Sequence, residues 1–130
     1  EVPLLDCVAD MQVVFQTDVN NDGVLEWNDS QWATGLTAEQ IRQQVRSVII
    51  YVLAHEGQRD TSFTFTNFSG ACSTGSCIRV GDQPPAGLTC SPLGTAICGR
   101  DFDLRGIIGD TFANYRWKVY TMAVTLYNLR

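Results

Sequence analysis

The sequence predicts an α+β fold in which one short helix packs on an antiparallel β-sheet, with a long irregular insertion held by disulfides. Several long stretches are rich in β-branched and aromatic residues, which favour strands. One segment carries the signals of a helix start, and four of the five cysteines lie between Cys72 and Cys98. A chain of 130 residues is expected to form a single domain, 1–130, with these elements in layers.

The first element is "VADMQVVF", Val8 to Phe15. Its apolar residues fit a helical face, but Met11, Val13 and Phe15 also alternate as the residues of a strand do. We favour a strand at its end, because the β-branched Val13 and Val14 run directly into the acidic loop that follows.

The one helix is expected in "LTAEQIRQQVRSV". Thr37 is a good N-cap, and Gln40 three residues later completes a capping box. The helix should be short, because the residues from about Val45 onward are β-branched, aromatic and typical of a strand. Another half-buried strand is predicted in "TSFTFTNF", where Phe63 and Phe65 alternate with polar residues.

The last element, "NYRWKVYTMAVTLYNL", predicts a long strand. Trp117 lies on the opposite face from Arg116 and Lys118, so we expect Trp117 to be buried. The apolar residues shift from one face to the other near Tyr120, which indicates that the strand twists or bends.

The segment from Ser69 to Gly99 is predicted to be an irregular insertion, rich in glycine, proline and cysteine. The cysteines are spaced C-x4-C and C-x7-C. Paired zinc ligands usually have two to four residues between them, so the second pair fits a zinc site badly and disulfides are favoured. Sequential pairing would join Cys72 to Cys77 and Cys90 to Cys98, each closing a loop worth roughly 2–3 kcal/mol. Nested pairing, Cys72–Cys98 around Cys77–Cys90, stays open, although we lean towards the sequential pattern.

Four remaining residues are candidates for catalytic groups. Cys7 lies in an apolar setting and is expected to be a buried free thiol, and His55, the only histidine, is interpreted as a structural residue. Glu56 and Asp60 are interpreted as a solvated turn with Arg59 as their local partner. No nucleophile elbow, zinc-protease or phosphate-loop motif is present in the sequence, so no catalytic residue is predicted and the protein is not expected to be an enzyme.

Charge and hydropathy exclude two further classes. The net charge is −5, and the nine basic residues are scattered, so no nucleic-acid partner is expected. The longest apolar run, Val48 to Ala54, is no longer than a strand, so no membrane span is expected within this chain. The density of cysteine indicates an oxidising compartment: extracellular, at the cell surface or periplasmic.

The loop "DVNNDGVLEWND" has the order of residues that calcium loops have. Alternate short side chains in such a turn point inward, and Gly23 permits the reversal that brings a backbone carbonyl to the ion. Hard oxygen ligands suit Ca²⁺ better than a transition metal. The predicted ligands are the side chains of Asp18, Asn20 and Asp22, the carbonyl of Val24, and Glu26 or Asp29. The alternative is a metal-free turn, which Asn, Asp and Gly also favour.

A complete EF-hand is not expected around this loop. The exiting helix that an EF-hand needs is missing, because Gly35 and a new capping box at Thr37 follow within a few residues. No second loop of this kind is present in the sequence. We therefore interpret the loop as a structural calcium staple in a connection between strand and helix.

Taken in order, four segments resemble the C-terminal part of the PilW family of minor pilins. They are "PLLDCVADMQVVFQTDVNNDGV", "LTAEQIRQQVRSVIIYVLAHEGQRD", "GRDFDL" and "NYRWKVYTMAVTLYNLR". The resemblance covers most of the chain outside Ser69 to Gly99, and its most specific parts are "EGQRD" and "NYRWKVYT". It implies a non-enzymatic component of a type IV pilus with a β-rich globular head, related to the J-type pseudopilin of type II secretion. Such heads also carry acidic loops after the first segment.

The resemblance implies that other pilin subunits are partners and that the head acts in pilus assembly or at the filament surface or tip. Pilins of this class begin with a long apolar helix, which nothing in this sequence resembles. We therefore expect a soluble portion of a larger pilin, or a head whose helix comes from a separate subunit. The alternative is an extracellular calcium-binding adhesion module of the dockerin type, because the loop matches one half of a dockerin in its spacing.

Overall fold

The computed structural model describes residues 7–24, 30–31, 37–70, 72–82 and 99–126 of the chain. The chain divides into two compact units, which are described separately below. Unit 1 comprises Glu1–Gln12, Tyr51–Val80 and Arg100–Tyr120, and unit 2 comprises Val13–Ile50, Gly81–Gly99 and Thr121–Arg130. The expectation of a single domain stays a prediction.

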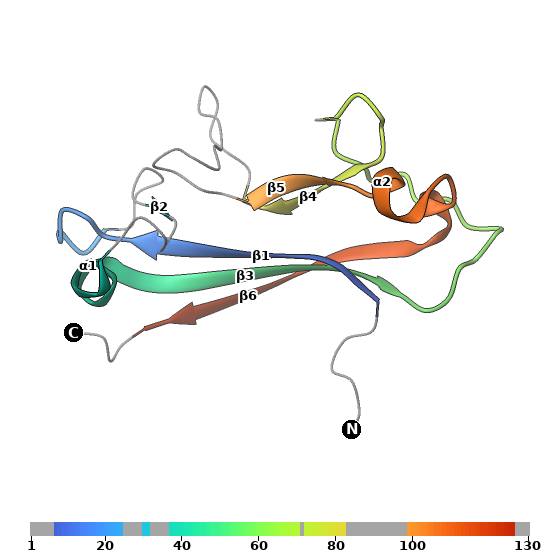
Figure 1. The fold of residues 1–130 in the computed structure, drawn as a ribbon. Coiled ribbons are helices and arrows are strands. Elements are labelled where there is room, and N and C mark those ends of the chain that lie inside the picture. The colour runs from blue at the N-terminus through green and yellow to red at the C-terminus, as the bar shows by residue number, and fades with distance from the viewer. Residues whose placement is uncertain (1–6, 25–29, 32–36, 71, 83–98, 127–130) are drawn as a thin grey trace. The chain divides into compact units, whose positions relative to one another are not determined.

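The described elements form an α+β fold with antiparallel sheets, as the sequence predicts. A four-stranded sheet has the order β2-β1-β3-β6, and Figure 1 shows its strands β1, β3 and β6 alternating in direction. A second sheet pairs β4 with β5. The strands are β1 (Val8–Thr17), β2 (Ser30–Gln31), β3 (Val45–Glu56), β4 (Cys77–Gly81), β5 (Gly99–Asp103) and β6 (Arg116–Thr125). The helical elements are α1 (Ala38–Gln44), the single turn α2 (Arg105–Ile108) and a 3₁₀ turn at Phe112–Asn114.

Helix α1 begins and ends as the sequence predicts. The Gln40 N–H donates to Thr37 Oγ1 (3.2 Å), and the Thr37 N–H donates to Gln40 Oε1 (2.8 Å), which completes the capping box. The backbone is already extended at Val45, where β3 starts without an intervening loop. The β-branched residues that follow explain why the helix stops after seven residues. None of the residues of α1 is buried.

The two long predicted strands at either end of the chain are confirmed. "VADMQVVF" lies within β1 and does not form a helix. Trp117 in β6 is buried, with 6% of its surface exposed, while the neighbouring Arg116 and Lys118 are exposed. Alternation of side chains across a strand produces this pattern.

Two expectations about the middle of the chain are wrong. Residues 61–68 are not a strand: the Phe65 N–H donates to the Ala113 carbonyl (2.7 Å), and Asn114 Nδ2 donates to the Phe63 carbonyl (2.9 Å). The segment therefore satisfies its backbone on the 3₁₀ turn and not on a sheet neighbour, although Phe63 and Phe65 are half-buried as expected. The segment Ser69 to Gly99 is not irregular throughout, because it contains β4.

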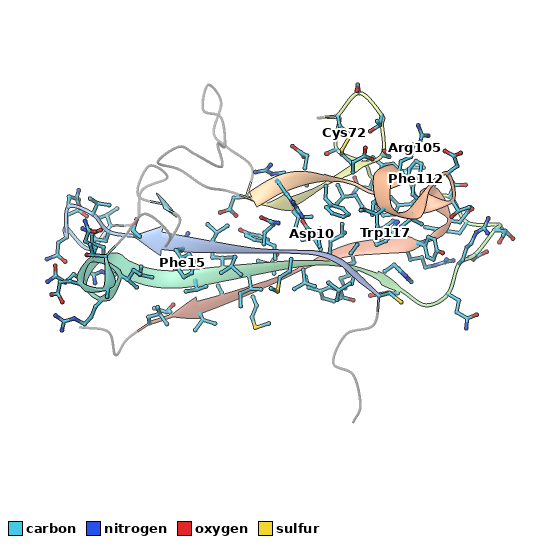
Figure 2. All side chains as sticks on the ribbon, viewed as in Figure 1. Asp10, Phe15, Cys72, Arg105, Phe112 and Trp117 are labelled. Atoms are coloured by element: carbon cyan, nitrogen blue, oxygen red, sulfur yellow. A yellow bond between two sulfur atoms is a disulfide. The ribbon has the colours of Figure 1, made fainter. Side chains whose placement is uncertain are left out.

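Unit 1 contains an aromatic and aliphatic core. Leu53, Val80 and Leu104 are fully buried. The Trp117 indole N–H donates to the Phe112 carbonyl at 2.7 Å, and Figure 2 shows the two side chains close together. That bond satisfies the polar group of a buried tryptophan. Unit 1 also buries the carboxylate of Asp10, which forms a bidentate ion pair with the guanidinium of Arg100 in β5.

One predicted disulfide is confirmed and one thiol was placed wrongly. Cys72 and Cys77 are joined, with their sulfur atoms 2.07 Å apart, at the start of β4 (Figure 2). Cys90 and Cys98 lie outside the described residues, so their pairing stays a prediction. Cys7 is free, as expected, but the expectation that it is buried is wrong, because Cys7 is exposed. It has a positive φ and lies immediately before β1, outside the core.

Candidate functional site

The predicted calcium loop follows β1 directly and lies in unit 2. β1 ends at Thr17, and the backbone N–H of Asp18 donates to the carbonyl of Gln44 at 2.8 Å. Gln44 is the last residue of α1, so the loop starts at the corner where α1 becomes β3. Asp18 is 1% exposed, whereas residues 19–24 are exposed. The buried end of the loop is therefore held by residues that lie far along the sequence.

Side-chain oxygens of the loop converge on one backbone amide. The Asp22 N–H donates both to Asp18 Oδ1 (3.0 Å) and to Asn20 Oδ1 (3.1 Å). The Gly23 N–H donates to Asp18 Oδ2 (3.0 Å). The Asn20 amide nitrogen in turn donates to Asp22 Oδ2 at 2.9 Å. The structure thus brings Asp18, Asn20 and Asp22, three predicted ligands, into one small turn.

Two residues with positive φ make this turn possible. Gly23 has φ +85°, in the position where the sequence predicts a glycine reversal, and that prediction is confirmed. Asn21 has φ +59°, a conformation that asparagine tolerates better than most residues. The part played by Asn21 was not predicted, although the Asn-Asn-Asp-Gly run contained the signal.

Arg46 of β3 supplies the counter-charge for the buried carboxylate. Its Nε lies 3.4 Å from Asp18 Oδ2, and its terminal nitrogen donates to Asn21 Oδ1. Burial raises the pKa of Asp18, but the N–H groups of Gly23 and Asp22 and the guanidinium of Arg46 outweigh it and hold that pKa below its ordinary value. Asp18 is therefore ionised at neutral pH, as a calcium ligand must be. Sequence analysis missed Arg46, because no local pattern joins residues 28 positions apart.

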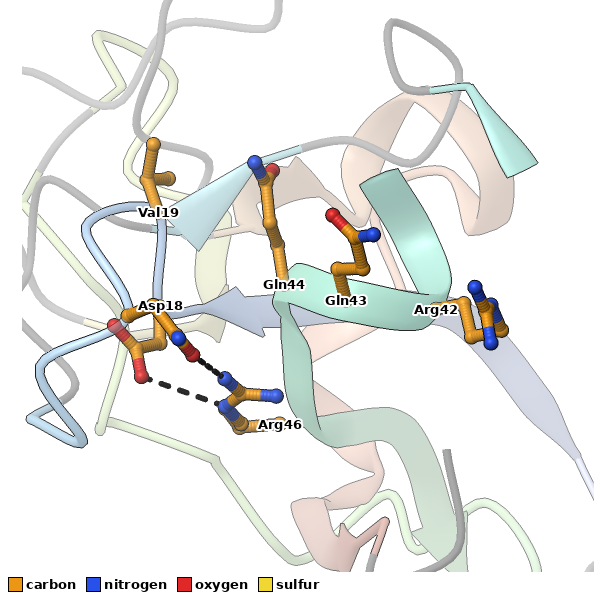
Figure 3. A pocket seen from close by; sticks show the side chains of 7 residues that line it. Asp18, Val19, Arg42, Gln43, Gln44 and Arg46 are labelled. Atoms are coloured by element: carbon orange, nitrogen blue, oxygen red, sulfur yellow. Dashed lines mark hydrogen bonds and ion pairs between the residues drawn. The ribbon is translucent and has the colours of Figure 1, made fainter. Parts of the chain in front are cut away.

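A pocket of about 480 Å³ adjoins the buried end of the loop (Figure 3). Within it, Arg46 points toward Asp18, whereas Arg42 lies at the far side and pairs with Glu39 at 2.6 Å. Both guanidinium groups thus already have carboxylate partners. The pocket is lined by Asp18, Val19, Asn21, Arg42, Gln43, Gln44 and Arg46.

The remaining predicted ligands are placed only in part. Val24 is 56% exposed, and its N–H donates to Asp22 Oδ1 at 2.8 Å. Glu26 and Asp29 lie outside the described residues. Among the described residues, no group of three or more His, Cys, Asp or Glu side chains could hold a metal ion. The described part of the loop offers the carboxylates of Asp18 and Asp22 and the amide of Asn20. The oxygen donors present are of the kind that calcium prefers, and they fit the ion chemically.

The other residues weighed as catalytic groups have structural contacts. The His55 ring packs on Tyr115 and Trp117, with centroids 4.5 and 5.2 Å apart, and its Nδ1 lies 2.9 Å from the Gly57 carbonyl. The expectation that Asp60 pairs with Arg59 is wrong, because Asp60 pairs with Arg116 at 3.1 Å. The Asp60 N–H donates to the Asn114 carbonyl (2.9 Å), which brings Asp60 close to Arg116 at the start of β6.

No helix in the described residues is both long and apolar enough to cross a membrane. The chain matches no known protein family, no curated protein and no solved structure. The resemblance to minor pilins and the calcium loop therefore stay predictions.

Proposed function

We propose that the chain is the globular head of a type IV minor pilin, a non-enzymatic extracellular domain that uses its acidic loop as a structural calcium staple. Its partners would be other pilin subunits. The pilin part of the proposal rests on the four ordered segments of the sequence, together with an antiparallel, strand-rich fold. The Cys72–Cys77 disulfide supports an oxidising compartment.

One observation carries the calcium part: Asp18 Oδ1 and Asn20 Oδ1 converge on the amide of Asp22. Both oxygens keep a lone pair after they accept that hydrogen bond, so they remain able to bind an ion. Asp18, Asn20 and Asp22 would hold calcium through their side chains at about 2.3–2.6 Å, with the Val24 carbonyl and Glu26 or Asp29 completing the shell. Calcium would supply positive charge that neutralises clustered carboxylates.

Arg46 has a definite part in this proposal. The guanidinium partly neutralises Asp18 and orients its carboxylate at the head of the loop. The exposed carboxylate of Asp22 has no ion pair among the described residues, and the neighbouring Asn20 contributes only an amide to it. Calcium would therefore act chiefly on the exposed half of the loop, while Arg46 holds the buried half.

Filament incorporation tests the pilin part. Cells that express a tagged chain together with its pilus genes are sheared, and the filaments are probed for the tag. The chain is expected in the filament fraction when calcium is present, and Asp22→Ala is expected to lower its amount there towards the amount that the wild type shows in chelator. Asp110→Ala is the matched control, because Asp110 is an acidic residue whose side chain is 94% exposed and which lies outside the loop. Absence of the chain from filaments, with piliation unchanged when its gene is deleted, would contradict the proposal.

Partner capture separates the alternative function. The purified chain is offered pilin subunits and, in parallel, cohesin-type modules, both in the presence of calcium. Binding to pilin subunits supports a minor pilin. Binding to a cohesin-type module alone would favour the adhesion module of the dockerin type.

A further inference from the structure

The second half of β6, Thr121–Thr125, is exposed along its whole length. β6 is the last strand of its sheet, and β3 is its one neighbour among the described residues (Figure 1). Met122 and Val124 are 58% and 43% exposed. The segment contains no charged residue and no proline, two of the devices that usually keep a free sheet edge from pairing. Within the described residues, this edge is therefore open to another strand.

The backbone of this segment presents its hydrogen-bonding groups in a definite pattern. The Leu126 N–H donates to the Arg46 carbonyl in β3 at 2.9 Å. Because successive residues of a strand direct their backbone groups to opposite sides, Met122 and Val124 also face β3. The N–H and C=O groups that face the open edge belong to Thr121, Ala123 and Thr125.

We propose that this edge pairs with the same segment of a second copy of the chain, antiparallel and centred on Ala123. In that register Ala123 lies opposite its counterpart, Thr121 lies opposite Thr125, and Met122 lies opposite Val124. Each outward-facing residue then exchanges both backbone hydrogen bonds with the residue opposite. The arrangement has twofold symmetry, so one edge serves both copies.

A second copy fits this edge because the segment reads nearly the same in both directions. Threonines stand at both ends and alanine at the centre, so threonine meets threonine on one face of the joined sheet. Methionine meets valine on the other face, where both are now exposed. Such pairs are favourable across antiparallel strands, and no like charges are brought together. Each copy carries a net charge of −5, so screening by salt should strengthen the association.

Sedimentation equilibrium of the whole chain, from micromolar to millimolar concentration, tests the proposal. The wild-type mass is expected to rise with concentration from 14.4 kDa towards twice that value, and more readily at high salt. Ala123→Lys and Ala123→Glu each place two like charges opposite one another, so each should raise the dissociation constant at least about tenfold. An equimolar mixture of the two variants should associate again, because opposite charges then meet.

Met11→Lys is the matched control, because Met11 is 59% exposed and belongs to β1, which does not pair with β6. It should associate as the wild type does. Circular dichroism and melting temperature confirm that each variant is folded. A wild-type chain that stays monomeric at every concentration would overturn the proposal. So would an Ala123→Lys variant that associates normally, or a mixture of the variants that fails to associate. Capture of an unlike chain by this edge, with the wild type itself monomeric, would assign the edge to another occupant.

Discussion

The two units differ in what they bury. Among the described residues, unit 1 buries a run of apolar side chains, from Tyr51 to Ala54, together with Ile78, Val80, Leu104, Phe112 and Trp117. Unit 2 buries the apolar Val14 and Val45, and beside them the polar Thr17, Asp18 and Ser47. Apolar burial is non-directional, whereas buried polar groups need partners in the right geometry. Unit 1 also buries the polar Asp10 and Ser76, but most of its buried side chains are apolar. The stability of unit 1 should therefore depend chiefly on volume, and that of unit 2 more on the polar contacts around Asp18.

The largest effect is expected from Trp117→Ala in unit 1. This change removes a side chain that is 6% exposed and the hydrogen bond to the Phe112 carbonyl, so it should cost about 3–5 kcal/mol of unfolding free energy. Urea denaturation measures the loss. Met122→Ala, in the same strand but 58% exposed, should change the unfolding free energy by no more than about 0.5 kcal/mol. Equal losses for the two variants would contradict the assignment of the core.

Calcium should act on unit 2. At a hundredfold excess over its dissociation constant, an ion that binds only the folded chain stabilises it by about 2.7 kcal/mol. The melting temperature should therefore be higher in calcium than in chelator. Asp22→Ala should abolish this difference, and Asp110→Ala should preserve it. An equal melting temperature of the wild type in calcium and in chelator would leave the loop as a metal-free turn.

The disulfide of unit 1 should have a slightly smaller effect. In the chain-entropy model, closing the short loop between Cys72 and Cys77 stabilises the fold by about 2 kcal/mol. The double variant Cys72→Ser, Cys77→Ser should lose this amount in urea denaturation. Reduction of the wild type is the companion measurement, because it leaves the buried Cys77 in place. Insensitivity of the wild type to reduction would show that Ser69, whose N–H donates to the Cys77 carbonyl at 2.8 Å, suffices to hold the turn.

The smallest effect concerns acid. The hydroxyl of the buried Ser76 donates to Asp103, and this bond holds the pKa of Asp103 below its ordinary value of 3.8. Burial raises the pKa of Asp103, and the hydrogen bond from the Arg105 N–H lowers it further. A depressed pKa contributes stability above the ordinary value, and that stability is lost as pH falls through the folded-state pKa. Asp103→Asn should therefore lower the melting temperature at pH 7, and the difference from wild type should shrink below pH 4. A difference in melting temperature that is the same below pH 4 as at pH 7 would contradict this account.

Local signals explain what the sequence could predict. The capping box at Thr37 and the alternation around Trp117 depend on residues within a few positions of each other, and both features are confirmed. The Asp18–Arg46 and Asp10–Arg100 pairs join residues 28 and 90 positions apart, so no local pattern could predict them. The segment around Phe63 has the alternation of a strand, but its backbone partners were decided by the 3₁₀ turn. Cys7 was misplaced because apolar neighbours in sequence do not fix burial.

The anchoring of Asp18 has a consequence for the order of events in folding. Contacts between Asn20 and Asp22 span two positions and can form as soon as the turn does. The contacts of Asp18 with Gln44 and Arg46 form only after β1 and β3 have met, at the entropic cost of closing a long loop, so its full set of contacts is completed late. On the function proposed above, calcium would join the chain late. It should then slow unfolding while leaving the rate of folding nearly unchanged.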